Sequence, residues 1–226
     1  MYLSHYLFYL IIPMLLGMWA QFRVTSAFNK FSRIRVSSNI TGADAARDIL
    51  NAAQIHDVEV VEINGMLGDH YDPTSKQLCL SSETYGTPSI AAVGIAAHET
   101  GHAIQHAKAY APLKMRMSIV PVTQIASKML PFVIIGGFWF HMFALIQLGV
   151  VVYLVLTVFQ LITLPVEFDA SRRAKIILHN MGIVQSGQEA AGVNSVLNAA
   201  ALTYVAAFVA AVGNLLYLLS LSQRRN

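Results

Sequence analysis

AAHETGHA, residues 96–103, contains the five-residue pattern H-E-x-x-H, from which the rest of the chain can be interpreted. On an α-helix, His98 and His102 are four residues apart, so their imidazoles lie on one face and can bind one ion. The pattern is typical of zinc sites. Glu99 directly follows the first histidine and can take a proton from a water that attacks a carbonyl. The pattern therefore predicts metal-assisted hydrolysis of an amide bond.

The residues before the pattern indicate that this helix is buried. Residues 90–97 are small and apolar throughout, which is typical of a buried helix. In such a helix the carboxylate of Glu99 would be unfavourable unless it were paired or near a bound metal. The same pattern also occurs by chance in helices that bind nothing, but here two histidines and a glutamate follow an apolar run. We therefore predict a metal site on a helix over residues 89–108, which Pro88 precedes and which ends before Pro112.

The composition is that of a membrane protein. Of the 226 residues, 55% are hydrophobic and 12% are charged, whereas an average soluble domain has about 25% charged residues. The single cysteine, Cys79, excludes an internal disulfide and a cysteine-based metal cluster, and we expect it on the inward face of a strand. We expect the lipid bilayer, and no nucleic acid, as a partner of the chain.

Four apolar spans are expected to cross the bilayer as helices. The first, 3–20, is followed by positive charge instead of being preceded by it, and no small-residue cleavage site follows. We therefore interpret it as an uncleaved transmembrane helix and not as a signal peptide. The run 118–164 is too long for one span and predicts a hairpin of two, with a turn between Gly136-Gly137 and His141. The last span is 197–221.

The catalytic segment 21–116, between the first two spans, predicts a small α+β region. A helix over 41–53 has Thr41 as its cap, and strands are expected at 58–63 and 78–80. The strands can pair as a small sheet beside the H-E-x-x-H helix. An exposed edge of that sheet could bind an extended peptide substrate. Alternatively, the sheet only covers the helix, and both interpretations stay open.

The third metal ligand is expected from one of two residues. His106 lies on the same helix, eight residues beyond His98, which is roughly 12 Å and too far for both to bind one zinc. Glu167, in the segment 165–196, is the better candidate, because two histidines with a downstream glutamate form a known catalytic zinc set. Two spans separate Glu167 from the H-E-x-x-H helix, so the chain returns to the same side of the membrane before it.

Two further polar residues are candidates for supporting roles. Asp169 could accept a hydrogen bond from a ligating histidine, or it could pair with Arg172 or Arg173 at helical spacing. His70 precedes the second strand and could act in catalysis by donating a hydrogen bond to the transition state. A turn of this composition is also an ordinary solvated loop.

Five blocks of sequence resemble the YugP family of bacterial membrane zinc metallopeptidases, and the likeness covers nearly the whole chain. The blocks are GMLGDHYDP (65–73), LS (80–81), AHETGHAIQ (97–105), PVEFDAS (165–171) and AALTYVA (200–206). The resemblance implies a neutral zinc metallopeptidase of the gluzincin kind, with a zincin-like catalytic domain, distantly similar to HtpX and the CAAX prenyl proteases. Their third ligand is a glutamate in an E-x-x-x-D block. Glu167 matches that glutamate, whereas Ser171 occupies the aspartate position and the nearby aspartate is Asp169.

These residues predict an α-helical membrane protein whose 226 residues form a single zinc-peptidase domain. We expect a membrane-bound endopeptidase of the bacterial plasma membrane that hydrolyses peptides or membrane-protein segments. The alternative is a membrane scaffold that retains the zinc site and binds a protein partner or a second copy. A structural zinc site normally has four protein ligands and no use for Glu99, which favours the enzyme. An intramembrane protease is disfavoured, because the H-E-x-x-H helix is too short to cross the bilayer.

Basic residues near the ends of the spans gather on one side of the membrane. On the side of the catalytic segment they are Arg23, Lys30, Arg33, Arg35, Lys114, Arg116, Arg172, Arg173 and Lys175, and on the other side they are Arg224 and Arg225. The positive-inside rule then predicts that the catalytic segment is cytoplasmic and that both termini are outside.

Overall fold

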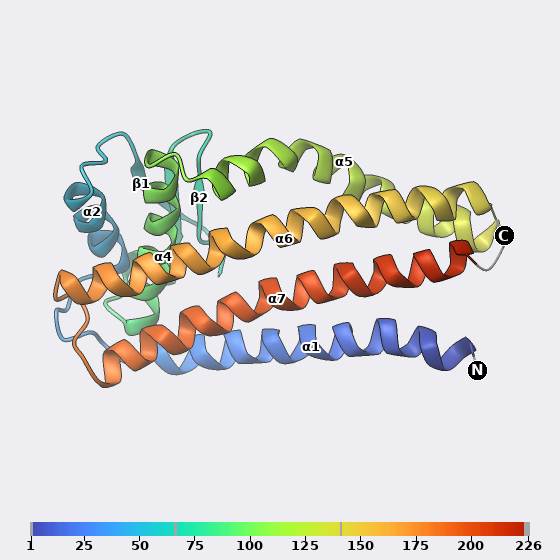
Figure 1. Cartoon of the computed structure of the whole chain (residues 1–226). Coiled ribbons are helices and arrows are strands. Elements are labelled where there is room, and N and C mark those ends of the chain that lie inside the picture. Colours follow the sequence, from blue (N-terminus) through green and yellow to red (C-terminus); the bar gives the residue numbers. More distant parts are fainter. Residues whose placement is uncertain (1, 66, 141, 224–226) are drawn as a thin grey trace. The chain divides into compact units, whose positions relative to one another are not determined.

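The computed structural model describes residues 2–65, 67–140 and 142–223, which are mostly helical (Figure 1). In chain order the elements are α1 (Tyr2–Phe31), α2 (Gly42–Ala52), β1 (Glu59–Ile63), β2 (His70–Asp72), β3 (Gln77–Ser81), α3 (Ser82–Gly86), α4 (Ile90–Ala107), α5 (Ala111–Trp139), α6 (Phe143–Asn180) and α7 (Gln188–Gln223). They form two compact units. The apolar unit is Met1–Ala20, Lys114–Pro165 and Leu202–Asn226, and the α+β unit is Gln21–Leu113 and Val166–Ala201.

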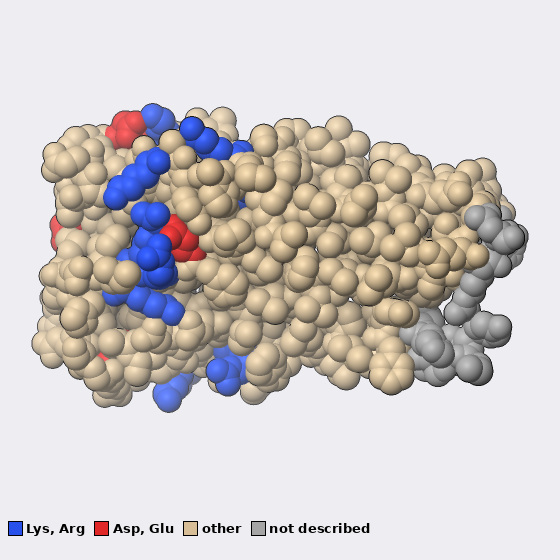
Figure 2. All heavy atoms as spheres, viewed as in Figure 1, with Lys and Arg blue, Asp and Glu red and all other residues tan. Residues whose placement is uncertain are grey.

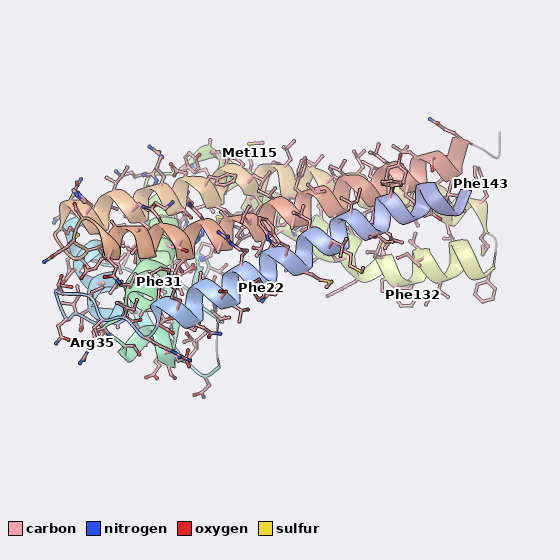
Figure 3. All side chains as sticks on the ribbon, turned by 90° about the horizontal axis from the view of Figure 1, so that it is seen from below. Phe22, Phe31, Arg35, Met115, Phe132 and Phe143 are labelled. Atoms are coloured by element: carbon pink, nitrogen blue, oxygen red, sulfur yellow. The ribbon has the colours of Figure 1, made fainter. Side chains whose placement is uncertain are left out.

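In the part of the chain that the structure describes, four helices, α1, α5, α6 and α7, are long and apolar enough to cross a membrane, which confirms the number of predicted spans. On the face shown in Figure 2, Lys and Arg gather in one area, and a wide stretch carries no charged side chain. Large apolar side chains of these helices are exposed: Phe132 is 76% exposed and points outward from α5 in Figure 3. Such a surface is unfavourable in water and suits contact with lipid hydrocarbon.

All four of these helices extend beyond the predicted spans, and α5 begins at Ala111, before the predicted start of the hairpin at 118. The first continues past 3–20 to Phe31, because Phe28 and Phe31 are buried in the core of the α+β unit. In the same way α6 continues through Pro165 to Asn180, so Glu167 lies on the third spanning helix itself. The last helix begins at Gln188, before the predicted start at 197. A hydropathy pattern identifies only the apolar, lipid-facing part of a helix. These helices are longer than that part because their ends pack against the core of the α+β unit.

The turn of the helical hairpin lies slightly later than predicted. Gly136 and Gly137 belong to α5, which ends at Trp139, and α6 begins at Phe143. A Cβ atom added at Gly136 would lie 2.2 Å from a methyl group of Leu145. Gly136 therefore packs against the Leu145 side chain from within α5 and does not form the turn. His141 lies outside the described residues.

The α+β unit contains the predicted helix and strands and one further strand. Thr41 caps α2: its hydroxyl accepts a hydrogen bond from the Asp44 backbone N–H, and the Asp44 carboxylate accepts one from the Thr41 N–H. The sheet has the order β1-β3-β2, with β1 parallel and β2 antiparallel to β3. Residues 70–72, predicted as a turn, form β2 because they pair with β3. This strand is too short and too polar to be detected from the sequence alone. Cys79 on β3 is buried, as expected.

The crossing of α4 and α6 fixes the position of the H-E-x-x-H residues. Nearly the whole of α4 is buried, as the apolar residues before the pattern predict. A Cβ atom added at Gly101 would lie 2.9 Å from the carbonyl oxygen of Ala170. The glycine inside the pattern therefore allows the backbone of α6 to approach α4 closely, at the level where both helices carry polar side chains.

Candidate metal centre

Three buried side chains meet where α4 crosses α6. Glu167 Oε2 lies 3.3 Å from His98 Nε2 and 3.4 Å from His102 Nε2. The exposed fraction of Glu167 is only 2%, and both histidines are buried. Within residues 2–65, 67–140 and 142–223, this is the one group of three or more His, Cys, Asp or Glu side chains placed to hold a metal ion.

Two of the three distances between the ligand atoms fit zinc, and all three atoms lie within 4.8 Å of one another. Nitrogen and oxygen ligands bind zinc at about 2.0–2.2 Å in a tetrahedral arrangement, which puts ligand atoms roughly 3.4 Å from one another. The distances from Glu167 Oε2 to the two imidazole nitrogens match this value. Three protein ligands would leave the fourth position for water or substrate, as in catalytic zinc sites.

His102 is held by a chain of hydrogen bonds that leads to Asp169. Its Nδ1 lies 3.1 Å from Gln105 Oε1, and because an amide oxygen can only accept, Nδ1 carries the proton and Nε2 faces Glu167. Gln105 Nε2 donates to the Val166 carbonyl at 2.8 Å and to Asp169 Oδ2 at 2.9 Å. Burial by itself would lower the pKa of His102, but the Glu167 carboxylate beside it raises the pKa overall.

Asp169 forms the ion pairs that its sequence position left open, whereas it is linked to His102 only through Gln105 and not by a direct hydrogen bond. Besides accepting from Gln105, it accepts hydrogen bonds from Arg172 and Arg173, one and the same carboxylate serving all three. The aspartate is therefore fixed by ion pairs on one side and supports His102 through Gln105 on the other.

Ser171 holds the other histidine. Its Oγ lies 3.1 Å from His98 Nδ1, while His98 Nε2 faces Glu167. We assign the proton to Nδ1, which then donates to the hydroxyl and leaves Nε2 free for a metal. Ser171 occupies the position at which the E-x-x-x-D block has its aspartate, so a neutral hydroxyl here contacts the histidine.

Glu99 lies beside the open edge of the sheet. Its Oε2 accepts a hydrogen bond from the Tyr71 backbone N–H at 3.1 Å. Because Glu99 uses this N–H, the side of β2 that does not pair with β3 faces Glu99. Burial raises the pKa of the Glu99 carboxyl, and the neighbouring imidazoles of His98 and His102 oppose this rise.

His106 and His70 lie apart from the three-residue group. Burial, with the charges of Asp57 and Asp72, raises the pKa of Tyr71 to about 12. The protonated Tyr71 hydroxyl is hydrogen-bonded to His106 Nδ1 at 2.9 Å. The exposed His70 ring donates from Nδ1 to the Gly68 carbonyl at 2.7 Å. A catalytic role for His70 stays a prediction.

Sequence reasoning did not identify Gln105 or the Tyr71 backbone as parts of the site. Gln105 follows His102 by three residues, which places both side chains on one helix face and could have indicated the contact. Nothing in the sequence indicates the Tyr71 N–H, because every residue except proline provides that group. Its role comes from the pairing of β2 with β3.

Comparison with known proteins agrees with this arrangement. The model of a family described as "Putative neutral zinc metallopeptidase" matches residues 6–223. The chain belongs to this family. It is also 45% identical over 211 residues to the "Putative membrane protease YugP" of Bacillus subtilis (strain 168), covering 93% of each chain. No solved structure gives a significant match. The resemblance to the YugP family is confirmed, as is a helical membrane-protein fold with a small sheet.

Proposed function

We propose that this protein is a membrane-bound zinc endopeptidase in which His98, His102 and Glu167 bind the metal. The observation that carries the proposal is that these three buried side chains place their ligand atoms within 4.8 Å of one another, with Glu167 Oε2 3.3 and 3.4 Å from the two imidazole nitrogens. Membership of a family of neutral zinc metallopeptidases gives independent support. The chain would act as one domain, since α6 belongs to both units and carries Glu167.

Each polar residue has a distinct role in this proposal. Zinc bound at the site would polarise the scissile carbonyl and lower the pKa of a water. Glu99 takes the proton of the attacking water and delivers it to the leaving amine. The Tyr71 N–H holds the Glu99 carboxylate in place. His70 is proposed to donate a hydrogen bond to the transition state.

The open edge of β2 is proposed to bind the substrate. A peptide held along this edge would pass Glu99, which faces the same edge and already accepts the Tyr71 N–H. Recognition of this kind uses the peptide backbone of the substrate, so it requires a segment of the substrate that is unfolded. Peptides and exposed segments of membrane proteins are therefore the proposed substrates.

A direct assay distinguishes the peptidase from a membrane scaffold with a retained zinc site. The purified full-length protein should contain about one zinc per chain and cleave members of a random peptide library. A chelator should stop cleavage, and added zinc should restore it. A protein that binds zinc, remains folded and cleaves no member of the library would favour the scaffold.

We also propose that the α+β unit is cytoplasmic and that the protein lies in the plasma membrane. The basis is the excess of basic residues near the span ends on that side of the chain. A cysteine introduced at Asn64, in the exposed turn before β2, should resist an impermeant thiol reagent in intact cells and react after lysis. Labelling of intact cells at Asn64 would invert the orientation without affecting the zinc site.

A further inference from the structure

A cavity of about 350 Å³ lies along the face of α4 that carries Glu99. Ala103, His106 and Ala107 of α4 form part of its wall. Ala103 and His106 follow Glu99 by four and seven residues, which places these three side chains on one stripe of the helix. The cavity is therefore reached from Glu99 by following α4 toward its C-terminal end.

Tyr71 connects this cavity with the open edge of β2. Its backbone N–H donates to Glu99 Oε2 at 3.1 Å, so the backbone of Tyr71 lies at the edge proposed to bind the substrate. Its side chain lines the cavity, and its ring centroid lies 5.9 Å from that of His106. The strand and α4 contact each other (Figure 1). A peptide held along β2 would therefore pass both Glu99 and the cavity.

Distances along α4 match the spacing of side chains in an extended peptide. Ala103 and Ala107 lie roughly 6 and 12 Å beyond Glu99 along the helix axis. An extended peptide advances roughly 3.3 Å per residue, so a side chain about two to four residues from the bond beside Glu99 reaches the cavity. Because the α4 residues of the wall all follow Glu99, this side chain lies on one fixed side of that bond.

The composition of the wall favours an uncharged, apolar side chain. Among the described residues, the polar groups of the wall are already paired with one another. Asp57 and Lys76 form an ion pair, and the Tyr71 hydroxyl is hydrogen-bonded to His106. A charged side chain would lose water there without gaining a free partner. The other lining residues are apolar: Ile55, Val58, Ala103 and Ala107.

We propose that this cavity is a subsite for a large apolar substrate side chain, such as leucine or phenylalanine, on one side of the scissile bond. Ligand pockets typically enclose roughly 300–1,000 Å³. A cavity of about 350 Å³ is near the lower end of this range and suits a single side chain. The small Ala103 and Ala107 leave the space that this side chain fills. The inference rests on the proposed peptidase function and adds a substrate preference to it.

Cleavage of a random peptide library by the purified full-length protein tests the subsite. Sequencing of the products should show a large apolar residue enriched at one position, about two to four residues to one side of the cleaved bond. For two peptides that differ only at that position, leucine should give a kcat/KM about ten- to hundredfold above alanine, because it buries more apolar area. Ala107→Leu fills the cavity from the exposed end of α4 and should lower this ratio about tenfold or more.

The matched control for this variant is Ala52→Leu. Ala52 is the exposed last residue of α2, as Ala107 is of α4, and it lies outside the cavity. This control should keep the wild-type preference for leucine. Zinc content and thermal unfolding check that both variants are folded.

Peptide binding by Glu99→Gln separates the subsite from the peptidase activity. Library peptides that this variant retains should be enriched in the same apolar residue, and Glu99→Gln with Ala107→Leu should not select it. If the wild type cleaves no peptide but this selection occurs, the peptidase proposal fails and the cavity still binds an apolar side chain. The subsite is wrong if neither experiment shows enrichment, or if Ala107→Leu leaves the enrichment unchanged.

Discussion

Glu99→Gln is expected to abolish peptide cleavage while leaving the fold and the zinc content unchanged. Glutamine has the same shape but cannot take a proton from the attacking water, and such general acid–base catalysis typically contributes 10²–10⁴-fold to rate. The amide can still accept the Tyr71 N–H, which the carboxylate accepts at 3.1 Å. Initial rates on a peptide that the wild type cleaves, with zinc measured by plasma mass spectrometry, test this expectation.

The matched control for this variant is Glu62→Gln, which removes a carboxylate from an exposed position on β1. It should cleave peptides at the wild-type rate. In cells, a strain carrying Glu99→Gln at normal membrane levels should resemble a strain that lacks the protein. Full complementation of the deletion by Glu99→Gln would show that the cell needs a scaffold and not a peptidase.

Glu167→Gln is expected to lose most bound zinc. The glutamate is almost completely buried, so glutamine, which keeps its volume, is less disruptive than alanine. Loss of a residue that only supports a ligand typically lowers metal affinity 10–100-fold. Loss of a direct, charged ligand should therefore exceed about 100-fold. Competition with a chromogenic zinc chelator, read at increasing chelator concentration, measures the change in affinity.

His106→Ala is the control for Glu167→Gln, since His106 was the other candidate for the third ligand. Its ring contacts Tyr71 and lies outside the three-residue group, so its zinc affinity should equal that of the wild type. If Glu167→Gln binds zinc normally and His106→Ala does not, the ligand assignment is wrong.

The parts of the fold that sequence predicts are those with local causes. Thr41 and Asp44 cap α2 through groups three residues apart, and the apolar runs of the four long helices carry their own signal. The third strand was missed, because β2 depends on its partner β3. The ends of α1 and α6 were missed for a related reason: burial of Phe31 and of Glu167 reflects contacts with distant segments.

The candidate site shows the same division. His98 and His102 come together because of helix geometry, and counting spans is enough to bring Glu167 to their side of the membrane. The contacts of Ser171 with His98 and of Gln105 with His102 depend on the angle and separation of α4 and α6. The small separation is possible because Gly101 has no side chain. A sequence pattern shows the glycine but gives no distance between the two helices.

The separation of His98 from Glu167 along the chain has a consequence for biosynthesis. The residues are 69 positions apart, and α5 and the first part of α6 lie between them. A ribosome completes the H-E-x-x-H helix well before it makes Glu167, and the carboxylate reaches the histidines only after both intervening helices have entered the bilayer. A nascent or half-inserted chain therefore lacks the complete proposed metal-binding set, which would keep a peptidase silent until its own membrane insertion is finished.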